Sequence, residues 1–249
     1  MQSTSTARGN FILLLFIRTG LVVCQFPIVT QAIHWYTAFA QDHDAQFLLQ
    51  GVTEGFSYQF TDPDPDGEFY NVANYIPVEH VEKVDAWVQS ETAAGRYISV
   101  NHECTLNPRG TAAIGVVDKD HSNFVKVRVV HDLSRPENVS TNDGIDIPHS
   151  SLPTVGDAFA LLQPGWYQAK IDLTSAYRSI PVHPDHWRFQ CGEWVGTVFA
   201  DCALSFGFRA APSIFDRITQ AIVRALRAIR VIGFIVLGFR VRGLRVLGL

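Results

Sequence analysis

Acidic residues are missing from the last part of this sequence. From position 217 to position 249 there are seven arginines and no lysine, aspartate or glutamate. The first 216 residues therefore carry 13 basic and 24 acidic groups, although the formal net charge of the whole chain is only -4. A nucleic-acid-binding domain usually presents a basic face, so the charge of this larger part gives no support to nucleic-acid binding.

Cysteines are few, and none of the four belongs to a Cys-x-x-Cys pair. This argues against a structural zinc site or a disulfide framework, and we expect an intracellular location, in the cytoplasm or the nucleus. His183, His186 and Cys191 lie close together, but prolines and an acid interleave them and no fourth ligand stands at a usual spacing. We therefore assign no zinc site there.

Long apolar runs are absent as well, so we expect no stable membrane span. Residues 11–17 form a run of seven apolar residues, but Arg18 interrupts it. The role of residues 1–33 stays open among a weak signal sequence, a buried strand and read-through of non-coding sequence, with secretion ranked last.

The composition is that of a globular protein. Of the 249 residues, 47% are hydrophobic and 18% are charged, which suits one large domain or two small ones. Two helices are predicted in a helical segment spanning residues 34–96. The first covers residues 34–60, with Asp42 or Asp44 as cap and Gly55 near its end, and a turn-rich loop follows at 61–75. The second runs from Pro77 to Ala94 and stops at Gly95.

Short β-rich runs follow at residues 97–100, 112–117 and 124–130. The last two predict a β-ribbon with Lys119, Lys126 and Arg128 on or near its tip. These cations either hold an anion or are simply solvated.

An acid ends the next apolar run. A short helix is predicted at residues 154–162, and the following strand ends at Asp172. A carboxylate at the end of a buried strand is costly unless it meets a cation, and a hard divalent ion is the usual solution. The pattern also fits a carboxylate that caps the turn at Thr174 or Ser175.

A hairpin and a helix complete the readable pattern. Residues 188–191 and 197–203 flank a predicted turn at 192–196. Gly207 then allows a sharp turn or a close approach of the backbone to a ligand. Pro212 is placed to start a helix with one buried face.

Together these pieces resemble the reverse transcriptase domain of DIRS-like retrotransposons, over residues 34–234. Residues 126–136 and 140–145 resemble the fingers segment, residues 170–184 resemble motif A, and residues 204–215 resemble motif B. The resemblance implies an α/β (α+β) right-hand polymerase, with fingers and an antiparallel palm sheet backed by helices at residues 97–229, and no thumb. It also implies an RNA-directed DNA polymerase whose partners are an RNA/DNA template-primer and a deoxynucleoside triphosphate.

The resemblance also assigns roles to residues. Asp172 would be the catalytic aspartate, and its carboxylate and the Leu173 carbonyl would hold Mg²⁺. The nucleotide would be bound by cationic, aromatic and glycine positions, namely Lys119, Lys126, Arg128, Tyr177, Phe206 and Gly207. Tyr177 would exclude a 2′-hydroxyl from the sugar site. Template or structural roles would fall to Asp132, Arg209 and Pro212.

One expected motif is missing. Motif C, Tyr-x-Asp-Asp, should lie near residues 234–237, where neither aspartate is found. Residues 230–249 instead form a degenerate Arg/Val/Gly/Leu tail typical of a reading-frame slip or a decayed copy. One carboxylate cannot hold two metal ions in reactive geometry, so we predict a polymerase fragment that is inactive alone.

Other functions remain open. The first is a non-catalytic nucleic-acid-binding remnant of a retroelement, to which the arginine-rich tail adds affinity. The second is a membrane-associated or aggregation-prone tail at residues 231–249. An unrelated metal-dependent phosphotransferase would leave motif B unexplained.

Overall fold

The computed structural model describes residues 13–17, 20–24, 39–60, 69–101, 106–119, 121–146, 156, 160 and 175–228. Strands β1 to β9 are Leu13–Ile17, Gly20–Cys24, Tyr70–Asn71, Tyr97–Ser99, Gly110–Thr111, Ala113–Asp118, Val127–Asp132, Cys191–Trp194 and Thr197–Asp201. The α-helices whose bounds lie within the described residues are α2 (Ala45–Glu54), α3 (Val81–Ala93) and α5 (Ala211–Ala228). Three 3-10 helices, η2 (Val78–His80), η3 (Tyr177–Ser179) and η4 (Pro184–Phe189), join them.

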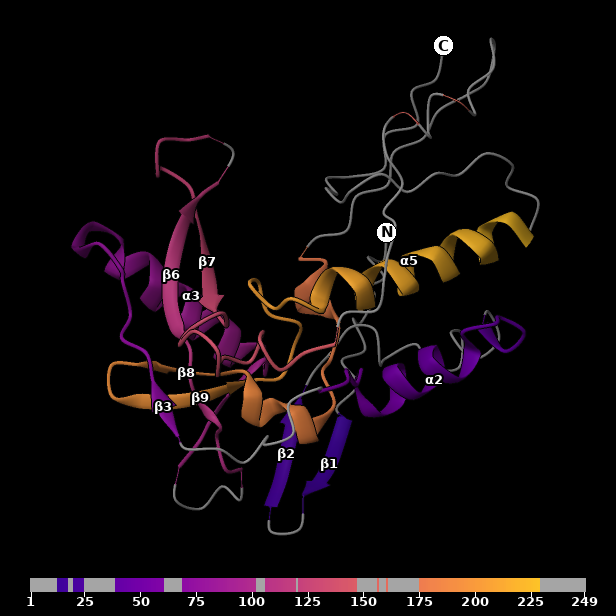
Figure 1. Cartoon of the computed structure of the whole chain (residues 1–249), viewed down its shortest axis with the longest axis horizontal. Coiled ribbons are helices and arrows are strands. Elements are labelled where there is room, and N and C mark those ends of the chain that lie inside the picture. Colours follow the sequence, from indigo (N-terminus) through magenta and orange to yellow (C-terminus); the bar gives the residue numbers. More distant parts are fainter. Residues whose placement is uncertain are drawn as a thin grey trace, which may run out of the picture.

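Antiparallel pairing dominates the described sheets. Strands β4, β9 and β8 form a three-stranded sheet, while β6 and β7 form a separate ribbon that projects from it (Figure 1). Among the named strands of the described residues, only the short β3–β5 pair is parallel. The sequence predicts one β-rich region at residues 97–132. Strand β4, however, pairs with β9 outside this region, with Tyr97 opposite Asp201. Such a partner, a hundred positions away, is not specified by any local pattern.

Strand β9 separates two hydrophobic clusters. Phe199 belongs to a cluster that also contains Val84 of α3 and Ile114 of β6. Its neighbour Ala200 belongs to a larger cluster that includes α2, η4 and α5. Because successive side chains of a strand point to opposite faces, this single strand connects both parts of the core.

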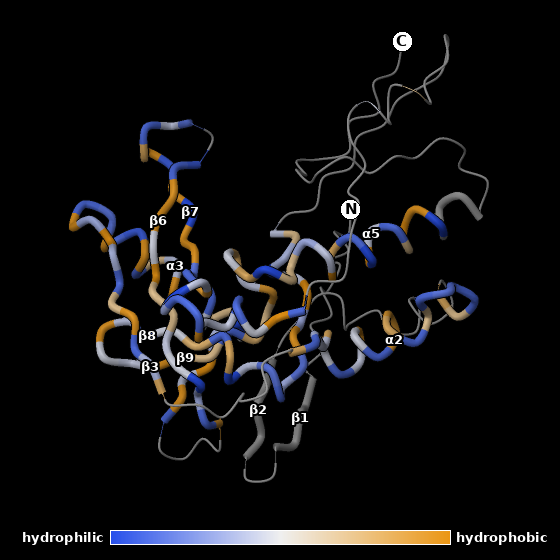
Figure 2. The backbone as a smooth tube through the Cα atoms, in the orientation of Figure 1, coloured by the Kyte–Doolittle hydropathy of each residue, from blue (hydrophilic) through white to orange (hydrophobic). Residues whose placement is uncertain are grey.

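The β6–β7 ribbon has one covered face and one open face. Ile114 pairs with His131, and both are buried toward α3. The alternate residues point to the other face, where Val117 pairs with Arg128. The strands of the ribbon are largely hydrophobic, whereas the loop at their far end is hydrophilic (Figure 2).

The first predicted helix is too long. Helix α2 begins at Ala45 and ends at Glu54, and Gly55, with φ of 95°, closes it by donating its N–H to the Gly51 carbonyl at 3.1 Å. The chain then turns away because the Phe56 N–H bonds the Pro181 carbonyl at 2.8 Å. Of the two predicted caps, Asp44 makes no side-chain capping bond, whereas the Asp42 carboxylate accepts the Asp44 N–H at 2.9 Å just before the helix begins.

The second predicted helix is confirmed, whereas the strand predicted at residues 124–130 begins later than expected. Helix α3 follows Pro77 and η2 and ends one residue before Ala94, with Gly95 in the left-handed region at φ of 69°. The predicted strand at 124–130 starts only at Val127, because Phe124 has a φ of 61° and belongs to the preceding loop.

The predicted hairpin at residues 188–203 is shifted. Arg188 and Phe189 belong to η4, so β8 begins at Cys191. The turn is only two residues long, Val195 and Gly196, with φ of 49° and 74°. Two successive positive φ values are typical of the tight turn that matches the twist of antiparallel strands.

Several predictions lie outside the described residues. These are most of the helix at 154–162, the strand leading to Asp172, and the tail at 230–249. At the N-terminus the apolar residues form β1, which pairs with β2. In the described part of the chain, no helix combines the length and apolar character that crossing a bilayer requires.

Candidate functional site

Three predicted nucleotide-binding residues from distant segments come together. The rings of Tyr177 and Phe206 lie 5.7 Å apart between centroids. The Arg128 guanidinium lies over the Phe206 ring, 5.3 Å from its centroid. Asp172 and Leu173, the predicted metal-binding residues, lie outside the described residues. The site is therefore built from the aromatic pair and the cation beside it.

The backbone at Gly207 requires glycine. Its φ is 99°, and a Cβ atom there would collide with the His131 carbonyl oxygen. The preceding residue, Phe206, accepts a hydrogen bond from the His131 N–H at 3.1 Å. The turn at 206–207 is thus docked directly on β7, which also carries Arg128.

Asn142 holds this turn from the other side. Its Nδ2 donates to the Gly207 carbonyl at 2.8 Å, and its Oδ1 accepts the Arg209 N–H at 2.8 Å. The Arg209 Nη1 also donates to the Asn142 carbonyl at 3.4 Å. Arg209 is exposed, and Pro212 lies exposed in the first turn of α5, as predicted from its position. The turn therefore has a fixed shape before any ligand binds.

A buried charge network anchors the residue that follows Tyr177. Arg178 donates to Glu91 from Nε at 2.9 Å and from Nη2 at 2.7 Å, and from Nη1 to Asp201 at 2.6 Å. Arg96 donates two further bonds to Glu91, at 2.7 and 2.6 Å. Two cations thus balance two carboxylates, which is the condition for burying such charges.

The network favours the charged forms of Glu91 and Arg178, whereas burial raises the pKa of Asp201 against the opposing effect of Arg178. Burial by itself raises the pKa of Glu91, but hydrogen bonds from Arg96 and Arg178 outweigh it and lower that pKa. Burial lowers the pKa of Arg178, yet the charge of Asp201 and the other acidic groups nearby raises it overall. Sequence reasoning missed Glu91, Arg178 and Asp201, because no local pattern distinguishes a charged residue that will be buried.

A second buried chain of polar groups adjoins the network. The Trp87 Nε1 donates to the Tyr97 hydroxyl at 3.2 Å, and that hydroxyl lies 2.8 Å from His131 Nε2. His131 Nδ1 lies 3.9 Å from the Asp201 carboxylate and makes no hydrogen bond. Burial, helped by the charge of Arg178, lowers the pKa of His131 to about 3. His131 is therefore neutral at physiological pH.

The remaining predicted cations lie on the open face of the ribbon. Lys119 and Lys126 are exposed at its far end, where the Lys119 N–H bonds the Lys126 carbonyl at 2.9 Å. Asp132, at the other end of β7, accepts the Ser134 N–H at 3.2 Å and lies 3.3 Å from Arg135 Nε. The face thus carries three cations, whereas its acid at Asp132 is already paired.

Comparisons with known proteins decide the fold. No family model and no curated protein matches the sequence. The foamy viral protease-reverse transcriptase in complex with an RNA/DNA hybrid is one similar structure. The match covers 66% of this chain and 20% of the viral chain, with 18% sequence identity and a TM-score of 0.52. For the same viral enzyme in complex with double-stranded DNA, the match covers 79% of this chain and 41% of the viral chain, with 13% sequence identity and a TM-score of 0.55.

The chain has a reverse transcriptase-like fold. The predicted mixture of helices with antiparallel sheets is thereby confirmed. The chain spans between a fifth and about two fifths of the length of these enzymes. At this level of identity the likeness concerns the fold alone.

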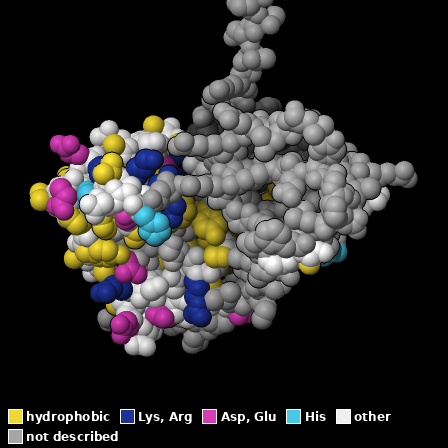
Figure 3. Space-filling view, turned by 90° about the horizontal axis from the view of Figure 1, so that it is seen from above, with side chains coloured by type: hydrophobic (Ala, Val, Ile, Leu, Met, Phe, Trp, Pro, Cys, Tyr) yellow, Lys and Arg dark blue, Asp and Glu magenta, His cyan; other side chains and the backbone are white. Residues whose placement is uncertain are grey.

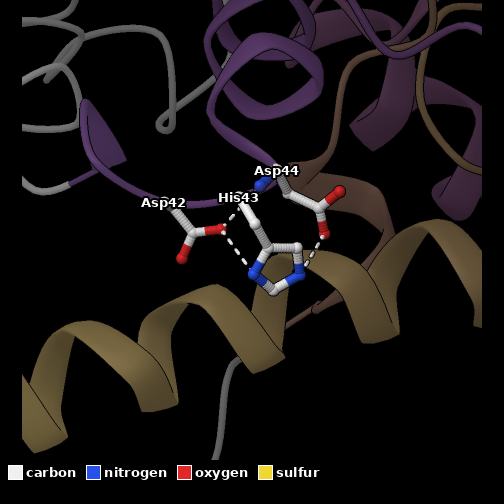
Figure 4. A group of neighbouring side chains, drawn as sticks. All are labelled: Asp42, His43 and Asp44. Carbon is white, nitrogen blue, oxygen red and sulfur yellow. Dashed lines mark hydrogen bonds and ion pairs between the residues drawn. The ribbon is translucent and has the colours of Figure 1, made fainter.

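A pair of acidic residues just before α2 has a structural role. Asp42 and Asp44 flank the ring of His43 (Figure 4), the only trio among the described residues with metal-ligand spacing. Arg224 already binds Asp42 at 2.7 and 2.8 Å, and Arg217 binds Asp44 at 2.5 Å. These ion pairs join the start of α2 to α5, which lies beside it (Figure 1). The trio needs no metal.

Proposed function

We propose that this chain is the fingers and palm part of an RNA-directed DNA polymerase from a DIRS-like retroelement, and that it binds template-primer. The meeting of Tyr177, Phe206 and Arg128 around the fixed turn at Gly207 carries this proposal. It unites residues of three motifs that are far apart in the sequence. The reverse transcriptase-like fold supports it independently.

Each residue of the candidate site would contact a different part of the bound nucleotide. The face of Tyr177 would pack against the deoxyribose, and the turn at Phe206 and Gly207 would lie under the new base pair. Arg128, with Lys119 and Lys126 further along the ribbon, would neutralise the triphosphate. Sequence information would come from base pairing, so the protein would contact mainly the nucleic-acid backbone.

The carboxylates available near the candidate site do not suffice as ligands for a pair of catalytic metal ions. Mg²⁺ would activate the 3′-hydroxyl and hold the triphosphate, with Asp172 and the Leu173 carbonyl as ligands. The buried carboxylates beside the Tyr177 turn, Glu91 and Asp201, are occupied by arginine. No acid follows Asp216 in the sequence. We therefore propose that the chain alone binds template-primer without extending it.

Two assays on the purified chain test this function. We expect no primer extension with Mg²⁺, and we expect binding to an RNA–DNA duplex that weakens steeply with salt. Template- and Mg²⁺-dependent synthesis that is abolished by Asp172→Asn would overturn the proposed inactivity. A lack of binding at low salt would overturn the proposed nucleic-acid function.

A further inference from the structure

Tyr97, the first residue of β4, lies between the supports of the two aromatic rings of the candidate site. Its hydroxyl is 2.8 Å from Nε2 of His131, the residue on which the Phe206 turn is docked. The guanidinium of Arg178, the residue that follows Tyr177, lies over the Tyr97 ring, 5.4 Å from its centroid. A single side chain thus contacts the residues that hold both rings.

The Tyr97 hydroxyl completes a buried chain of hydrogen bonds that begins on α3. The Trp87 Nε1 can only donate, so the Tyr97 oxygen accepts that bond at 3.2 Å and its own hydrogen is free for His131. Burial raises the pKa of Tyr97, with the charge of Asp201 acting in the same direction, so the hydroxyl keeps the proton that it donates. Because His131 Nδ1 makes no hydrogen bond within the described part of the chain, Tyr97 is the group that orients the imidazole.

His131 carries this chain of contacts to the Phe206 side of the site through its backbone. Its N–H donates to the Phe206 carbonyl at 3.1 Å, and its carbonyl oxygen occupies the space that a Cβ atom on Gly207 would need. Loss of the Tyr97 hydroxyl frees the imidazole to turn toward the Asp201 carboxylate, 3.9 Å from Nδ1. The backbone at residue 131, and the turn resting on it, can then shift.

The ring of Tyr97 supports the Tyr177 side of the site. It stacks on Phe199, with centroids 4.2 Å apart and an interplanar angle of 21°. Arg178 lies over the same ring while its Nη1 donates to Asp201 at 2.6 Å, and Asp201 is the residue paired with Tyr97 across β4 and β9. The ring beneath the guanidinium therefore belongs to the side chain whose hydroxyl orients His131.

Tyr97 cannot contact a ligand itself. It is only 3% exposed, whereas hydrophobic, Lys, Arg and His side chains stand together on the described part of the surface seen from above (Figure 3). Any effect of Tyr97 on ligand binding therefore reaches the site through His131 and Arg178.

We propose that Tyr97 is a positioning residue that sets the separation of the Tyr177 and Phe206 rings, and thereby the preference of the site for a deoxyribonucleoside over a ribonucleoside triphosphate. The two rings lie 5.7 Å apart, so a small displacement of either one changes the space left for a 2′-hydroxyl. The proposal rests on the proposed function, in which the Tyr177 face packs against the deoxyribose. It adds the buried residue that fixes this ring relative to Phe206.

The test measures nucleotide affinities of the full chain in complex with template-primer. A fluorescent deoxynucleoside triphosphate is displaced by dGTP or by GTP, and the ratio of the two affinities is the readout. Because both affinities refer to the same preparation, a loss of folded protein cancels from the ratio. Tyr97→Phe removes only the hydroxyl, and we expect it to lower the preference for dGTP by roughly 3-fold to 30-fold, the range typical of residues that act through their neighbours.

Two further variants sharpen the comparison. Trp87→Phe removes the donor on α3 and should lower the ratio in the same direction. Tyr58→Phe is the matched control, since Tyr58 is 8% exposed and its hydroxyl donates to the His186 carbonyl of η4 at 3.2 Å rather than to a support of either ring. Its ratio should stay as in wild type, and thermal melting shows that each variant is folded.

The outcomes keep this proposal apart from the proposed function. An unchanged ratio in Tyr97→Phe, or an equal fall in Tyr58→Phe, while wild type prefers dGTP, would overturn the positioning role alone. Equal affinities of wild type for dGTP and GTP would overturn sugar discrimination and the positioning role with it. Failure of wild type to bind template-primer and either nucleotide would overturn the proposed function itself.

Discussion

Arg178 binds Glu91 through two nitrogens although the residues are 87 positions apart. The preceding residue, Tyr177, contacts Phe206 and lies 5.4 Å from the ring of Phe215. The ion pair therefore ties the turn carrying Tyr177 to α3, and the bond to Asp201 ties it to β9. The position of the half-buried Tyr177 ring depends on charges buried behind it.

Replacing Arg178 should be strongly destabilising. Arg178→Met leaves Glu91 and Asp201 buried without their main cation, and we expect a loss of about 3–5 kcal/mol in the free energy of unfolding. Urea denaturation measures it. Arg224→Met is the matched control, because the Arg224 side chain is 31% exposed and pairs with Asp42 away from this network. Its loss should be less than half as large, and equal losses would contradict the role given to the network.

Gly207 should tolerate no side chain. Gly207→Ala combines a strained positive φ with a collision against the His131 carbonyl, and we expect roughly 2 kcal/mol or more of destabilisation. Gly196→Ala is the control, because φ there is 74° but nothing lies within 4 Å of the added Cβ. That variant should lose only about 1 kcal/mol in the same denaturation experiment. If the two alanine variants unfold alike, the turn at 207 is not held against β7.

Stability should fall in mild acid. His131 has a folded pKa of about 3, so between the ordinary histidine pKa near 6.5 and pH 3 the unfolded chain binds a proton that the folded chain does not. The free energy of unfolding then decreases as pH falls, by up to about 1.4 kcal/mol per pH unit for this group. Burial also lowers the pKa of His186 to about 4, which adds a slope of the same sign.

Urea titrations between pH 7 and pH 5 measure this dependence. Most carboxyl groups titrate below this window, so histidines dominate the slope. His131→Gln should flatten it. A slope in His131→Gln that equals the wild-type slope would show that His131 is not held neutral in the folded protein.

Arg128 should contribute to binding of the triphosphate. Under the proposed function, Arg128→Gln weakens binding of a fluorescent deoxynucleoside triphosphate to the complex of the chain with template-primer, because one cation facing the phosphates is lost. Fluorescence anisotropy measures this affinity. Arg217→Gln removes the same charge from α5, where Arg217 binds Asp44, and should leave the affinity as in wild type. An unchanged affinity in Arg128→Gln would remove this residue from the triphosphate site.

Local chemistry allowed several elements to be predicted from sequence. The helix after Pro77 and the start of α5 near Pro212 are found as expected, because proline favours the first turn and glycine ends the helix at Gly95. The predicted nucleotide-binding trio Arg128, Tyr177 and Phe206 is brought together. The roles assigned to Asp172 and Leu173 remain predictions, since these residues lie outside the described part.

The sequence by itself determined where α3 ends and where α5 begins, which ribbon carries cations, and which glycine forms the turn, because these depend on neighbours a few positions apart. Only the tertiary structure decided that β4 pairs with β9, that Glu91 and Asp201 surround Arg178, and that the Tyr97 hydroxyl meets His131. Those contacts join residues 23 to more than 100 positions apart. Their free energy depends on burial and on partners that exist only once the chain has folded.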